Sequence, residues 1–228
     1  MWPFDTSAWY LRPVSVLEEC KDFEQQRHEA CDFIAKVARR LNFPYRTIAS
    51  AQLYFHLFFS LHPHTDYPSM DIALTTLLVA SKAEETFQRI QQILVAAYRT
   101  LNPQAEGKVR IIEEHRVRVT QYEHLVLEAI DYNFAVRHAH EVLARIGAEL
   151  DLTSESMSSA FRFCKDCYYT PIVLCYPPEF IAAAAIIWMR TAEGSKTEEM
   201  RVLEKLVGSS QEKILKIIDF VKQSNKAM

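Results

Sequence analysis

The chain has 228 residues, of which 49% are hydrophobic and only 4 are glycine, and its formal net charge is -3. This length is enough for one large or two small domains, and the apolar content is enough to build a sizeable core. All-β barrels and glycine-dependent phosphate loops need more glycine, so the composition favours helices. Charges of both signs are interspersed and the balance is slightly acidic, which gives no support to direct binding of nucleic acid through its phosphates.

The cysteines are odd in number, and we expect them to be buried free thiols in a reducing compartment. The first residues lack the basic and then apolar layout of a signal peptide. No uninterrupted apolar run reaches the ~20 residues of a membrane span. The protein is therefore expected to be soluble and intracellular, without a membrane partner. The five cysteines are Cys20, Cys31, Cys164, Cys167 and Cys175.

The first half of the chain is predicted to be a succession of helices. The capping box Ser15–Glu18 predicts a short N-terminal helix. The third long segment, 72–80, is apolar nearly all round, with Ser69 as its expected N-cap, and such a helix belongs at the centre of a bundle. Apolar residues at helical spacing predict the long helices over residues 23–41, 45–61, 72–80, 87–101 and 112–131.

The second half repeats this pattern. The segment 180–188 is again apolar all round and lies about 110 residues after the first such segment, which indicates a weak internal repeat. Capping boxes that begin at Ser195 and Ser209 predict two further helices. The predicted fold is all-α, with two tandem five-helix bundles. The helices expected before the capping boxes cover 139–150, 154–169 and 180–188, and the predicted divisions of the chain are 1–22, 23–134 and 135–228.

A search for catalytic chemistry finds no phosphate-binding glycine loop, no Gly-x-Ser-x-Gly and no His-Glu-x-x-His. Cys164 and Cys167 form a lone Cys-x-x-Cys without a second ligand pair at zinc spacing, so we interpret them as core residues. His62 and His64 are interpreted as solvated loop residues. We expect no metal, no cofactor and no catalytic activity, and an enzyme with an unrecognised site is the alternative.

Three motifs occur in order on the predicted helices. Ala80–Thr86 resembles the Ala-x-Lys-x-Glu-Glu signature that ends the third helix of the cyclin box. Glu123–Leu127 is similar to the Glu-x-x-x-Leu segment of the fifth box helix, and Arg27 falls where cyclins carry the arginine of their first box helix. On these motifs the chain is identified as a member of the cyclin family. The resemblance implies two tandem cyclin boxes and a regulatory subunit of a cyclin-dependent protein kinase.

The resemblance also implies a binding face. In cyclins the lysine and glutamate of these motifs face the kinase and bond to its backbone, so Lys82 and Glu123 are expected to contact the kinase, with Glu85 beside them. Leu127 would add an apolar anchor, and Tyr132 occupies the place of an aromatic residue that packs against the kinase. The alternative is that Lys82 and Glu123 form an ordinary intramolecular surface pair.

Departures from the cell-cycle members favour the transcriptional branch of the family. Residues 26–30 lack two apolar anchors of the substrate-docking stretch of cell-cycle cyclins, and His56 stands where those cyclins tend to place an aspartate that pairs with the arginine corresponding to Arg27. The tracts Tyr54–Phe58 and Tyr176–Ala182 resemble those of cyclins K and T.

This branch implies a nuclear activator of a kinase that phosphorylates the repeat domain of RNA polymerase II in transcription elongation. The competing hypothesis is a cyclin-fold transcription adaptor that binds no kinase. A third regulatory subunit is a further expected partner. The apolar residues of the N-terminal segment either contact such a subunit or fold back onto the boxes. These residues are Trp2, Phe4, Trp9 and Tyr10.

Overall fold

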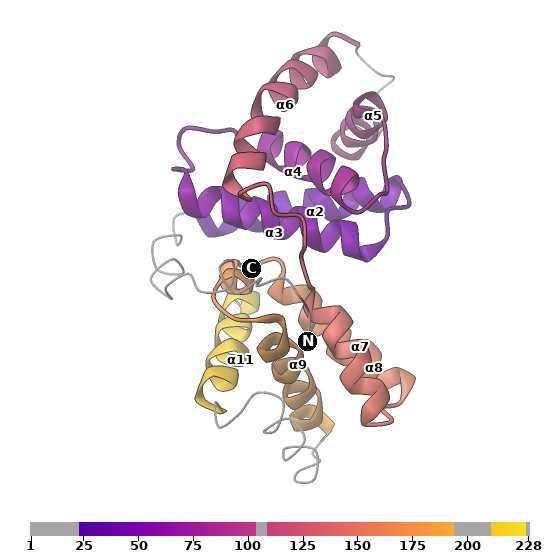
Figure 1. Ribbon diagram of the computed structural model, residues 1–228, viewed down its shortest axis with the longest axis vertical. Helices are drawn as coiled ribbons and strands as arrows, with labels where there is room; N and C mark the ends of the chain where they lie inside the picture. The colour runs from indigo at the N-terminus through magenta and orange to yellow at the C-terminus, as the bar shows by residue number, and fades with distance from the viewer. Residues whose placement is uncertain (1–22, 104–108, 194–210, 227–228) are drawn as a thin grey trace. The chain divides into compact units, whose positions relative to one another are not determined.

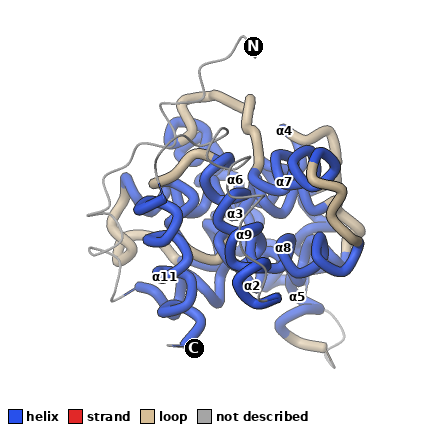
Figure 2. Tube along the Cα trace, turned by 90° about the horizontal axis from the view of Figure 1, so that it is seen from below, coloured by secondary structure: helices blue, strands red, loops and turns tan. Residues whose placement is uncertain are grey.

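The computed structural model describes residues 23–103, 109–193 and 211–226, and these residues form helices joined by loops, without a strand (Figures 1 and 2). The predicted all-α fold is thereby confirmed for the described residues. The chain separates into two compact units, with the boundary between Val136 and Arg137. The three predicted divisions of the chain remain a prediction.

The described residues of the first unit form five helices, and their bounds follow the expected periodicity closely. Two expectations at helix starts were wrong. Ser69 is the first helical residue rather than the cap, because the cap position is taken by Pro68. The fourth long helix begins at Ile90 rather than Phe87, and Phe87 lies in the preceding loop. The five helices are α2 (Glu24–Arg40), α3 (Tyr45–Leu61), α4 (Ser69–Ala83), α5 (Ile90–Leu101) and α6 (Val109–Ala129).

Helix α4 is the centre of this unit, and it contacts α2, α3, α5 and α6. All residues from Asp71 to Ser81 are buried. Polar side chains in such a position must find hydrogen-bond partners. Thr75 donates to the carbonyl of Asp71 at 2.7 Å, and Ser81 donates to the carbonyl of Leu78 at 2.8 Å. The helix therefore satisfies its own hydroxyl groups and presents apolar surface to its neighbours.

The second unit is built on the same plan around α9, which contacts α7, α8 and α11. Residues 181–186 of α9 are all buried. Thr153 caps α8, because its hydroxyl accepts a hydrogen bond from the backbone N–H of Ser156 at 3.2 Å. The elements are α7 (Ala139–Glu149), α8 (Ser154–Cys167), the short 3-10 helix η3 (Pro171–Leu174), α9 (Pro178–Glu193) and α11 (Gln211–Lys226). The N-terminal helix after Ser15 and the helix expected after Ser195 lie outside the described residues.

Four of the described helices end in the same cap without glycine. In each, the residue after the cap position has a positive φ. The backbone N–H of the following residue then donates to a carbonyl in the last turn of the helix, as Thr86 does to the carbonyl of Ser81 at 2.9 Å. This is the Schellman arrangement, in which glycine is the usual residue of positive φ. The four residues are Asn42 (φ 56°), Glu85 (φ 54°), Asp131 (φ 51°) and Asp151 (φ 48°). A chain with 4 glycines thus closes these helices with polar side chains.

Replacing Asp151, the residue of positive φ at the end of α7, with glycine should stabilise the second unit. A left-handed conformation costs an L residue about 1–2 kcal/mol, whereas the extra backbone entropy of glycine costs about 0.5–1 kcal/mol. We expect Asp151→Gly to raise the free energy of unfolding by about 0.5–1 kcal/mol in a denaturant titration. Ala144→Gly, in the exposed middle of the same helix, is the matched control and should lower it by about 1 kcal/mol. A lower free energy of unfolding for Asp151→Gly would show that the left-handed conformation of Asp151 is not strained.

Candidate functional site

Two ionic contacts orient α4 against α6. Near the start of α4, Asp71 accepts hydrogen bonds from His115 at 2.6 Å and from Arg118 at 2.5 Å, both of which lie on α6. At the other end, Lys82 in the last turn of α4 forms an ion pair with Glu123, which lies further along α6. The contacts advance in the same direction along both helices. The C-terminal ends of α4 and α6 therefore lie at the same end of the first unit.

The structure brings together Lys82 and Glu123, the two residues that carry the sequence hypothesis. Their side chains are 45% and 23% exposed. An ion pair this exposed contributes little to stability, about 0.2–1 kcal/mol. Lysine has three donors and a carboxylate has several acceptor sites, so the pair keeps hydrogen-bonding capacity for another molecule. The intramolecular surface pair is thus present, and it is compatible with a second role for the same groups.

The neighbouring glutamates of the motif differ in their surroundings. The carboxylate of Glu84 is only 6% exposed, pairs with Arg46 of α3, and accepts a hydrogen bond from Ser50 at 2.5 Å. Arg46 also donates to the backbone carbonyl of Val136 at 3.3 Å. Glu85 is exposed and occupies the left-handed cap position described above. Glu84 therefore joins α4 to α3, while Glu85 is available at the surface.

Sequence reasoning missed this role of Glu84. The signal available in the chain was Arg46 and Ser50, which are four residues apart and so share one face of α3. Their spacing indicates a polar spot on an otherwise apolar helix, but it does not identify which carboxylate meets it.

Apolar side chains follow the C-terminal ends of both helices. Leu127 is half-buried near the end of α6, and Tyr132, just beyond it, is 58% exposed. Phe134 and Phe87 are also exposed, the latter to 63%. Phe87 follows the end of α4, and sequence reasoning placed it in a helix instead. Large exposed apolar residues are enriched at interaction surfaces, and here they follow the two helices that carry the Lys82–Glu123 pair.

Arg27 and His56 meet inside the first unit. The guanidinium of Arg27 lies 3.3 Å from Nδ1 of His56 and 5.1 Å above the ring of Phe23. Because a guanidinium can only donate, Nδ1 must accept, and the ring proton of a neutral His56 then sits on Nε2. That nitrogen lies 3.7 Å from the sulfur of Cys31. A histidine thus takes the contact with the box arginine that an acidic residue would otherwise make.

The two cysteines of the Cys-x-x-Cys lie on α8 in the core of the second unit. Cys164 and Cys167 are fully buried free thiols, and burial raises the pKa of both. Their interpretation as core residues is confirmed. The described residues hold no group of three or more His, Cys, Asp or Glu side chains placed to bind a metal ion. Among the described helices, none combines the length and the apolar character that crossing a membrane requires.

The family of the chain follows from a comparison with known families. The family described as "Cyclin, N-terminal domain" matches residues 6–135, which is more than half of the chain. The protein therefore belongs to the cyclin family. The matched residues include all five helices of the first unit and the candidate contacts from Lys82 to Tyr132.

Among its relatives are cyclins of the transcriptional type, as the resemblance predicted. The "CTD kinase subunit beta" of Schizosaccharomyces pombe is 32% identical over 70% of this chain and 50% of its own length. Cyclin-T1-2 of Arabidopsis thaliana is 27% identical over 71% of this chain and 36% of its own. Human Cyclin-K is 27% identical over 70% of this chain and 28% of its own. The matched region is half or less of each of these relatives.

Solved structures confirm the fold. A chain of the yeast RNA Pol II CTD kinase CTDK-1 complex superposes with a TM-score of 0.77 at 19% identity, covering 92% of this chain and 73% of its own. A chain of the CAK complex of Chaetomium thermophilum gives 0.65 at 13% identity, covering 95% of this chain and 77% of its own. At these identities the likeness concerns the fold alone.

The two glutamates of the motif should respond differently to the same substitution. Glu84→Gln removes the charge that faces Arg46, and because Arg46 is half-exposed we expect a loss of only about 1 kcal/mol in the free energy of unfolding. Glu85→Gln should change it by less than about 0.5 kcal/mol. Denaturant titrations of both variants test this assignment. Equal losses in the free energy of unfolding would contradict the different roles given to the two glutamates.

Proposed function

We propose that this protein is a regulatory cyclin subunit that binds and activates a cyclin-dependent protein kinase. The observation that carries the proposal is the surface toward the C-terminal ends of α4 and α6, where the exposed Lys82–Glu123 pair joins the two helices, Leu127 lies in the last turn of α6 and the exposed Tyr132 follows it. These are the positions at which the family's motifs occur in this chain. The polar pair offers donors and acceptors to backbone groups of the kinase, and the apolar residues offer buried area.

The proposed mechanism is a shift in population. A kinase samples inactive and active arrangements of its regulatory helix, and a partner that binds the active arrangement better shifts the equilibrium toward it. Moving the ratio from 1:99 to 99:1 takes about 5.5 kcal/mol of differential binding. A half-exposed ion pair supplies about 0.2–1 kcal/mol. Lys82 and Glu123 therefore set the register of the complex, and Leu127, Tyr132 and neighbouring apolar groups supply most of the energy.

The relatives support a finer proposal about the substrate. One is named as a subunit of a CTD kinase, and others are cyclins of the K and T types. We place this chain with a kinase that phosphorylates the repeat domain of RNA polymerase II in transcription elongation, and hence in the nucleus. In this arrangement the kinase performs the phosphoryl transfer and the cyclin supplies no catalytic group. A third regulatory subunit completes the proposed assembly.

The direct experiment is a kinase assay on a heptad-repeat peptide from the polymerase tail. Purified cyclin-dependent kinases are tested with and without the full chain. Stimulation of one kinase that rises with the concentration of the chain and saturates supports the proposal. If no kinase is bound or stimulated, the protein is instead a cyclin-fold adaptor, and a salt-dependent shift of duplex DNA would identify the adaptor class that contacts promoters.

Removing the polar pair should weaken the complex without unfolding the chain. We expect Lys82→Ala with Glu123→Ala to lower affinity for the kinase by about twofold to tenfold, because a hydrogen bond exchanged with water contributes about 0.5–1.5 kcal/mol net. Surface plasmon resonance against the stimulated kinase measures this. Lys36→Ala with Asp32→Ala removes another exposed ion pair, on α2, and should leave affinity unchanged. Normal affinity in the first variant would remove this surface from consideration.

The apolar anchors should contribute more to the binding free energy than the ion pair does. Their contribution should not depend on the salt concentration. We expect Tyr132→Ala to cost about 2 kcal/mol or more of binding free energy, since buried aromatic anchors dominate interfaces. Calorimetric titrations at low and high salt separate the two contributions. Raising the salt should weaken the wild-type complex slightly and narrow its difference from the Lys82/Glu123 variant, while the deficit of Tyr132→Ala persists. A Tyr132→Ala deficit that vanishes in salt would refute this division of roles.

A further inference from the structure

Two segments of the first unit contain basic residues and no acidic residue. The segments are 33–65 and 86–105, and none of the 29 Asp and Glu residues of the chain falls in either. Their basic residues lie between positions 36 and 46 and at positions 89 and 99, in a protein whose net charge is -3. The basic residues concerned are Lys36, Arg39, Arg40, Arg46, Arg89 and Arg99. Such a separation of charge creates a locally positive surface that the overall composition hides.

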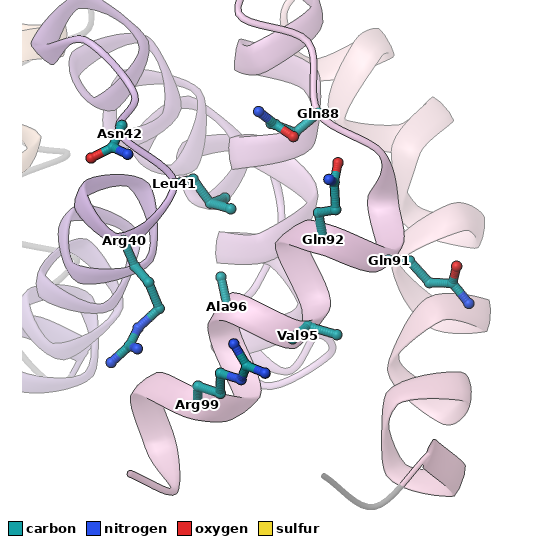
Figure 3. A pocket seen from close by; sticks show the side chains of 9 residues that line it. All are labelled: Arg40, Leu41, Asn42, Gln88, Gln91, Gln92, Val95, Ala96 and Arg99. Carbon is teal, nitrogen blue, oxygen red and sulfur yellow. The ribbon is translucent and has the colours of Figure 1, made fainter.

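The fold joins these two segments at one hollow. The C-terminal end of α2 and the helix α5 with its preceding loop border an open surface hollow of about 610 Å³ (Figure 3). Arg40 from α2 and Arg99 from α5 lie at one end of it, and Gln88 and Gln92 lie toward the other. The full lining consists of Arg40, Leu41, Asn42, Gln88, Gln91, Gln92, Val95, Ala96 and Arg99.

The two arginines have donors to offer. Both are exposed, and neither side chain makes a hydrogen bond or ion pair with another described residue. By contrast, the neighbouring Lys36 pairs with Asp32 on the same helix, and Arg46 pairs with Glu84. Each guanidinium presents five donors in a planar fork that suits the oxygens of phosphate or carboxylate. Arg40 and Arg99 also lie in the last turns of their helices, where the helix dipole favours a cation.

The rest of the lining favours a polypeptide as the carrier of the anion. Leu41, Val95 and Ala96 provide an apolar surface for a side chain. The glutamine amides can donate to and accept from a peptide backbone, and Gln92 already accepts from the backbone N–H of Arg89 at 3.2 Å. Proteins that bind single-stranded nucleic acid combine a basic groove with aromatic side chains on which the bases stack. The hollow has no aromatic residue in its lining.

We propose that this hollow is a docking site for a phosphorylated segment of a partner protein, with Arg40 and Arg99 together binding the phosphate. A phosphate group carries close to two negative charges at neutral pH and has three strong acceptor oxygens, so one group can engage two arginine forks. A single carboxylate has two oxygens and pairs with one guanidinium. The hollow shares no residue with the surface proposed for the kinase, so the two proposals can be tested separately.

Fluorescence anisotropy of the full chain against labelled peptide libraries tests the proposal. One library carries a fixed phosphoserine within randomised positions, and two matched libraries carry serine or glutamate at that position. We expect the phosphoserine library alone to bind measurably. Arg40→Ala and Arg99→Ala should each weaken this binding by at least about tenfold, with Arg→Lys changes losing less. Arg89→Ala, from the same acid-free segment but outside the lining, should bind as the wild type does.

Several outcomes would overturn the proposal. Equal binding of the serine library, or unchanged binding in both Arg40→Ala and Arg99→Ala, would exclude a phosphate site here. Equal binding of the glutamate library would make this a site for acidic peptides in general. Displacement of the library by inorganic phosphate, at concentrations no higher than the library itself needs to bind, would show that the peptide around the phosphate contributes nothing to binding. Thermal unfolding of each variant checks that these exposed changes leave the fold intact.

Discussion

Burial of α4 on every side is the constraint on which the first unit depends. A helix without a solvent face must place any charge at its ends, and α4 does so with Asp71 in its first turn and Glu84 at its cap. Each carboxylate is paired with an arginine from a different helix, Arg118 of α6 and Arg46 of α3. Buried carboxylates are costly unless paired in this way. The pairs fix α4 along its axis, and Lys82 is thereby held at the surface in one position.

The helices could be predicted from the sequence because their physics is local. Helical spacing located α2 and α3 almost to the residue, and the apolar run 72–80 identified the central helix. The errors occurred where local signals competed. Ser69 and Pro68 both suit a helix start, and proline took the cap position. Phe87 continued the apolar pattern of α5. After the left-handed turn at Glu85, however, the chain runs through a loop that contains Phe87, and α5 begins only at Ile90.

The candidate site was predictable only through the family resemblance. Lys82 and Glu123 are 41 residues apart, and no rule of spacing brings together side chains from two helices at that separation. The ties made by Glu84 and Asp71 were missed for the same reason, since each is satisfied by an arginine distant in the sequence. The hollow between α2 and α5 likewise arises from the packing of separate segments, although the lack of acidic residues along both segments was visible beforehand.

The caps without glycine have an evolutionary consequence. At Glu85 and Asp131 one position performs two tasks, turning the backbone at a helix end and displaying a charged side chain beside the proposed contacts. Glycine would relax the turn but erase the side chain, and a β-branched residue would strain the turn. Selection is thus constrained at these positions, because glycine, Asn and Asp adopt the turn most readily and only an acidic residue keeps the charge. Glycine at these positions in a homologue would mark a lineage that keeps the turn and has given up the charged contact.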